Sequence, residues 1–214
     1  MAPRRAIRLG GHNGSVSTSL STAYRNRSRR RLARLAGPVA AAVTIGSILL
    51  ATGLSATFRW ETSALSDLGT VGATSWLFNG GLVLGCLLGL PYGWALWTAA
   101  ADRLGRIRAG AFVAALLSMA GVGLFPAGET LHVPFAVAFF FLSALTLVVD
   151  GVARFRLPTG KLSLGAGITS PAAWPVWLLL VAPGGGIAVP EFVGAVLFAV
   201  WMIALSPERV GGDG

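Results

Sequence analysis

Residues 131–150 read LHVPFAVAFFFLSALTLVVD, and this stretch decides the fold. No charged side chain occurs between its His132 and its closing Asp150. About 20 apolar residues in a helix are enough to cross the hydrocarbon core of a bilayer. Because backbone polar groups cannot stay unpaired in lipid, and the stretch lacks the alternation of a strand, we expect a membrane-spanning helix.

Five further apolar blocks accompany this one along the 214 residues. Only 12% of the residues are charged, about half of the roughly 25% found in soluble domains. We therefore predict an all-α polytopic bundle of six transmembrane helices over residues 36–206. A disordered basic tail is expected before it (1–35) and a short tail after it (207–214). The other five blocks are placed at 37–57, 75–97, 109–125, 163–182 and 189–205.

The net charge of +9 is distributed unevenly along the chain. If both termini are cytoplasmic, 16 of the 17 Lys and Arg residues fall in cytoplasmic segments, and only Arg59 lies outside. This is the asymmetry of the positive-inside rule, so we expect a multi-pass protein of the plasma membrane with both ends in the cytoplasm. The basic residues are then topogenic and face lipid headgroups, and membrane lipids rather than nucleic acid are the expected partners.

The basic segment before the first block has a second interpretation. Residues 28–34 (SRRRLAR) resemble a twin-arginine export motif, and residues 51–53 (ATG) could serve as a small-residue cleavage site. Basic residues before a retained helix are the commoner arrangement.

Four glycines in the second block are spaced four residues apart, which places them on one stripe of a helix: Gly81, Gly85, Gly89 and Gly93. Small residues at this spacing let two membrane helices approach closely. The partner could be a neighbouring helix of the same chain, a second copy or another membrane protein, or a lipid.

Polar side chains gather in the segments predicted to lie outside. We expect them to line one outward-facing pocket, with Arg59 paired to an acid, and the candidates are Arg59, Ser66, Asp67, Asn79, Glu129 and His132. Glu191 follows a proline at a helix start and is explained by the helix dipole. Asp150 and Arg154, four residues apart, are expected to pair along one helix.

The expected function is non-enzymatic binding of a lipid or small ligand in that pocket. One alternative is an intramembrane hydrolase that uses Ser66 and His132; another is a structural subunit that binds a partner through the glycine stripe. The single cysteine, Cys86, excludes an intrachain disulfide. No motif for a cofactor or metal occurs, so none is expected.

Five elements of the sequence occur in a characteristic order: LSDLG (65–69), LFN (77–79), GVGLFP (121–126), His132 and FFF (139–141). In these elements the chain resembles the prokaryotic membrane proteins grouped as domain of unknown function 998 (DUF998). The resemblance covers roughly residues 38–206, implies six helices and implies no reaction. More remotely, through the Ser-Asp element and the later Phe and His, the chain resembles the eukaryotic Frag1/DRAM/Sfk1 membrane proteins, which are linked to lipid distribution. The positions carried over as family markers are Ser66, Asp67, Gly69, Asn79, Phe125 and His132.

Overall fold

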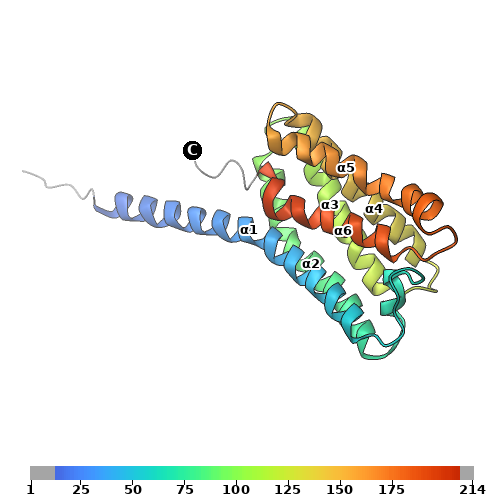
Figure 1. Ribbon diagram of the computed structural model, residues 1–214. Coiled ribbons are helices and arrows are strands. Elements are labelled where there is room, and N and C mark those ends of the chain that lie inside the picture. The colour runs from blue at the N-terminus through green and yellow to red at the C-terminus, as the bar shows by residue number, and fades with distance from the viewer. Residues whose placement is uncertain (1–12, 208–214) are drawn as a thin grey trace, which may run out of the picture. The chain divides into compact units, whose positions relative to one another are not determined.

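The computed structural model describes the backbone of residues 13–207 and the side chains of residues 33–207. Within this range the chain forms six helices, as predicted, and no strand (Figure 1). Short helical turns precede α2 and extend α5 and α6. The elements are α1 (Asn13–Leu54), η1 (Leu65–Gly69), α2 (Gly72–Ala99), α3 (Arg103–Leu124), α4 (His132–Ala153), α5 (Pro158–Val176), η2 (Trp177–Val181), α6 (Ala188–Val200) and η3 (Trp201–Leu205).

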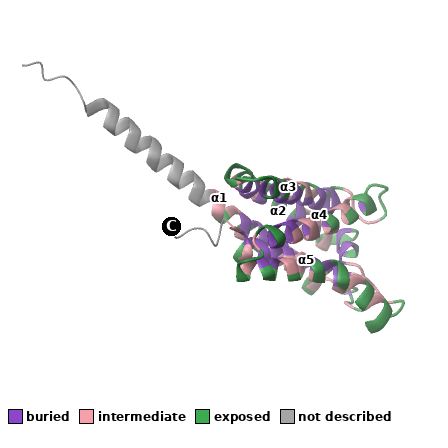
Figure 2. Ribbon diagram, turned by 90° about the horizontal axis from the view of Figure 1, so that it is seen from above, coloured by how far each residue is buried: buried purple, intermediate pink, exposed green. Residues whose placement is uncertain are grey.

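All six helices are long and apolar enough to cross a membrane, with spans of 18 to 28 residues among the described residues. The bundle exposes large apolar side chains, including Trp76 at 84% and Leu180 at 78%. Figure 2 shows buried residues along the inner faces of the helices and exposed residues on their outer faces. Apolar surface on this scale is suited to lipid rather than to water, and the chain is a multi-pass membrane protein.

Several helices begin earlier than predicted: α2 begins at Gly72 instead of 75 and α5 at Pro158 instead of 163, and the difference is larger for α3 and α1. The third helix begins at Arg103 instead of 109, because the Asp102 carboxylate caps it by accepting from the Gly105 N–H at 2.7 Å. Helical backbone also begins at Asn13, inside the stretch predicted to be a tail, since an existing helix extends without a new nucleus. Residues 1–12 and 208–214 of the predicted tails lie outside the described residues.

The glycine stripe of α2 packs against helices of the same chain, which is the first of the three alternatives above. A Cβ built on Gly81 would lie 1.8 Å from Ser47 Oγ in α1, and one built on Gly93 would lie 2.6 Å from Val113 in α3. Gly85 and Gly89 likewise face Thr44 and Leu116. The stripe is therefore covered inside the bundle.

Three connections lie together at one end of the bundle, called the η1 end: 55–71, 125–131 and 182–187 (Figure 1). The first and third are joined by backbone hydrogen bonds, from Gly186 N–H to Glu61 O at 2.7 Å and from Ala188 N–H to Ser63 O at 2.9 Å. Connections 100–102 and 154–157 lie at the opposite end, called the Asp150 end. The η1 end is thus a fastened group of loops over the helix ends.

Candidate functional site

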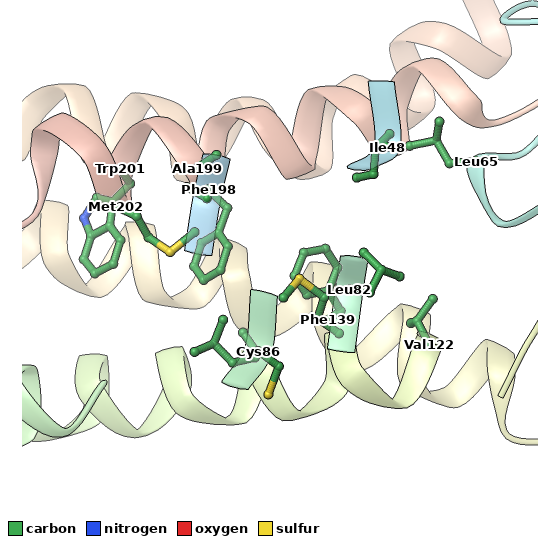
Figure 3. Packing of buried hydrophobic residues seen from close by; sticks show 14 of the residues in the cluster. Ile48, Leu65, Leu82, Cys86, Val122, Phe139, Phe198, Ala199, Trp201 and Met202 are labelled. Carbon is green, nitrogen blue, oxygen red and sulfur yellow. The ribbon is translucent and has the colours of Figure 1, made fainter. Parts of the chain in front are cut away.

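A cavity lies within the bundle, beside η1, and about 480 Å³ of space free of protein atoms lies in it and in the open region at its mouth. Most of its wall is apolar, and Figure 3 shows Ile48 and Leu65 lying across from Leu82, Phe139 and Val122. Five of the six helices contribute to it, together with η1. We call it the Glu191 cavity; its polar lining residues are Thr44, Ser66, His132 and Glu191.

Glu191 holds in place η1, which forms the roof of this cavity. It lies in the first turn of α6, is only 7% exposed, and its Oε2 accepts a hydrogen bond from the Leu65 N–H at 2.6 Å. This bond joins residues 126 positions apart and fastens η1 to α6. The carboxylate thus does more than oppose the dipole of its own helix, which was the explanation that the sequence suggested.

His132 enters the cavity from the first turn of α4 and is 8% exposed. Its Nδ1 lies 2.8 Å from the Phe125 carbonyl oxygen. Because a carbonyl only accepts, Nδ1 carries the proton, and Nε2 of the neutral ring is an acceptor. The side chain also ties the end of α3 to the start of α4.

Three polar atoms on residues that line the cavity have no hydrogen-bond partner among the described residues: Ser66 Oγ, His132 Nε2 and Glu191 Oε1. They are not among the fully buried polar atoms without a partner, which are Asn79 Oδ1, Arg108 Nε and Ser163 Oγ. Each therefore keeps accessible surface, and each is able to bond a ligand.

The other four predicted pocket residues do not line the Glu191 cavity, and nearby backbone groups bind the side chains of three of them. Asp67 Oδ2 accepts from the Ala64 N–H at 2.8 Å and so caps η1. Asn79 donates to the Gly69 carbonyl at 2.9 Å. Arg59 is exposed and donates to the Phe58 carbonyl at 2.9 Å, and the described residues contain no ion pair that includes it.

Glu129, the fourth, is exposed in the turn before α4. The structure thus brings Ser66 and His132 together in one cavity and adds Glu191. Sequence reasoning had noted Glu191 but explained it by its own helix. An acidic residue at the start of an otherwise apolar span was the available signal.

The arrangement lacks the contacts of a serine hydrolase. Among the described residues no hydrogen bond joins Ser66 to His132, and the His132 nitrogen that a carboxylate would orient in a catalytic triad is bound to a backbone carbonyl. The described residues also contain no group of three or more His, Cys, Asp or Glu side chains that could hold a metal ion. The arrangement can hold a ligand that donates hydrogen bonds.

A second polar group lies at the Asp150 end, and it is an ion-pair network. Asp150 is fully buried, and its carboxylate binds Arg108 Nη1 at 3.1 Å, Arg154 Nε at 2.9 Å and the Trp201 indole N–H at 2.8 Å. Arg154 also donates to the Leu205 carbonyl. The pair along α4 is confirmed, and the network additionally joins α3 and η3 to it.

Comparison with known proteins tests the two family resemblances. No curated protein and no solved structure matches the chain. The more distant resemblance to the Frag1/DRAM/Sfk1 proteins therefore rests on the quoted residues alone. A family model does match, over residues 20–207, which is most of the chain and includes all six spans. The chain belongs to the family described as protein of unknown function (DUF998).

Proposed function

We propose that the chain binds a small amphipathic molecule in the Glu191 cavity. The apolar part lies among Ile48, Leu82 and Phe139, and the polar head lies toward Ser66, His132 and Glu191. The observation that carries the proposal is an apolar wall with three polar atoms that have no partner within the described residues. Ligand sites typically combine a mostly apolar wall with a few polar groups in this way.

A pocket-filling substitution tests this proposal. Ala195 lines the cavity from α6, whereas Ala204 is exposed on η3. In nanodiscs, a dodecanol that carries a photoreactive diazirine should label cavity residues of the unmodified chain. Ala195→Phe should weaken this labelling by about tenfold or more, equivalent to ~1.4 kcal/mol, because the ring occupies the ligand's space. Ala204→Phe should leave it unchanged.

Labelling of the outer helix surface alone, or equal labelling of the two variants, would contradict binding in the cavity. Peptide mapping of the crosslinked residues distinguishes the two locations.

We also propose that the η1 end faces outward and the Asp150 end faces the cytoplasm of the cell, in the plasma membrane. The support is charge: the segments near the Asp150 end carry six basic residues, against one at the η1 end. The residues are Arg103, Arg106, Arg108, Arg154, Arg156 and Lys161, against Arg59.

Cysteine labelling tests the orientation. Glu61 and Arg106 are exposed at opposite ends of the bundle. With Cys86 replaced by serine, a membrane-impermeant maleimide added to intact cells should label Glu61→Cys and spare Arg106→Cys. Both should react after the cells are permeabilised. The reverse pattern in intact cells would invert the proposed topology.

A further inference from the structure

We infer that the ligand of the Glu191 cavity carries a primary ammonium group on its apolar chain. This inference rests on the proposed function and specifies the chemistry of the polar head. It starts from the charge of Glu191. The ion pairs of the described residues centre on Asp150, and none includes Glu191.

A buried carboxylate without a cationic partner is costly in an apolar site, and either a bound proton or a cationic ligand relieves that cost. Glu191 is 7% exposed and receives only one backbone hydrogen bond, through Oε2. Glu191 lines the cavity, and its second oxygen has no hydrogen-bond partner among the described residues. A cationic head would supply the missing countercharge, whereas an anionic head would add a second negative charge beside the first.

The hydrogen-bonding groups select among cations. Glu191 Oε1 and His132 Nε2 accept, and the Ser66 hydroxyl can also accept. A primary ammonium has three donors and no acceptor, which matches these three atoms. A hydroxyl head has a single donor, and a quaternary ammonium has none.

The protein surface around the cavity is negatively charged, as Glu191 inside it would be when ionised. Outside the cavity, the η1 end carries Glu61, Asp67 and Glu129 against Arg59 as its one basic residue among 33–207. This excess of negative charge favours the approach of a cation.

Three probes that share one dodecyl chain and differ in the head group test the inference: diazirine-bearing dodecylammonium, dodecanol and dodecanoate. Each probe is titrated against the full-length protein in phosphatidylcholine nanodiscs. Choline lipid has no N–H donor and so does not imitate the proposed head. We expect the ammonium probe to bind about tenfold or more tighter than the alcohol, as a charge-assisted hydrogen bond provides, and the carboxylate probe to bind weakest. This comparison requires no variant.

Glu191→Gln supplies the matched substitution. Its side-chain carbonyl can still accept from Leu65 N–H, so the roof contact is kept while the charge is removed. The ammonium probe should then bind no tighter than the alcohol. Glu129→Gln, an exposed acid at the same end, should preserve the difference between the probes.

The outcomes separate the inference from the proposed function. If all three probes bind the cavity equally, or if Glu191→Gln leaves the preference for ammonium intact, the inference is wrong and the binding function stands. If none of the probes reaches the cavity, the proposed function itself fails. Adding ethanolamine phospholipid to the nanodiscs identifies the source: competition with the ammonium probe indicates a lipid headgroup, and its absence indicates a free amine.

Discussion

Replacing Asp150 with alanine is expected to destabilise the bundle by about 3–5 kcal/mol, the usual cost of removing one partner from a buried ion pair. The carboxylate is fully buried and contacts Arg108, Arg154 and Trp201. Without it, two guanidinium groups remain in an apolar setting with no countercharge. Unfolding in detergent micelles by sodium dodecyl sulfate, followed by far-ultraviolet circular dichroism, measures the change.

Asp102→Ala is the control for this prediction. Asp102 is exposed and caps α3 through a single hydrogen bond to Gly105. Its loss should cost about 1 kcal/mol, as is typical of an N-cap. A loss of equal size for the two aspartates would mean that the buried network contributes no more than a cap.

A triple variant separates charge from packing. Asp150→Leu combined with Arg108→Met and Arg154→Met removes all three charges and keeps most of the volume. It should be more stable than Asp150→Ala alone, because no buried charge is left without a partner. If the triple variant is less stable than the unmodified chain by the sum of the losses of the three single variants, the network acts as independent contacts.

Gly151→Ala is expected to destabilise the bundle by about 3 kcal/mol, near the upper end of the costs of overpacking. A Cβ built on Gly151 in α4 would lie 2.5 Å from the backbone nitrogen of Leu164 in α5 and 2.6 Å from its Cα. Backbone atoms cannot rotate away as a side chain can, so the two helices must separate. The same unfolding measurement applies.

Gly165→Ala provides the matched comparison on the facing helix. Nothing lies within 4 Å of a Cβ built on Gly165, so the extra methyl meets no atom of the bundle. This variant should be neutral or slightly more stable, since alanine loses less conformational freedom in a helix than glycine does. Equal losses at Gly151 and Gly165 would show that α4 and α5 are not in backbone contact.

Most of the fold could be predicted from the sequence because lipid imposes simple conditions. A span needs a certain length, and its backbone must bond within itself. Residues 131–150, predicted as a helix, correspond closely to α4 (His132–Ala153). The largest error in a span boundary is the start of α3, at Arg103. A prediction from apolarity stops where the charged residues begin, but a helix can continue through charged residues near the membrane surface.

The candidate site was less accessible to sequence reasoning. Ser66 and His132 were predicted, and both line the Glu191 cavity. Asp67 and Asn79 have the same polar character, but their bonds to the nearby Ala64 and Gly69 backbones leave them outside its lining. Residue type does not reveal whether a side chain bonds locally or turns into the core, since both satisfy the same hydrogen-bonding groups.

The sequence alone determined the membrane class, the six helices and the charge asymmetry, because apolar length and charge position are properties of the chain itself. Only the tertiary structure assigned Glu191 and Arg108 their roles. Glu191 bonds Leu65, 126 residues away, and Arg108 binds Asp150, 42 residues away. In the sequence the first looks like a helix-dipole residue and the second like a topogenic charge. Their partners are fixed by which helices pack side by side, and no local pattern records that packing.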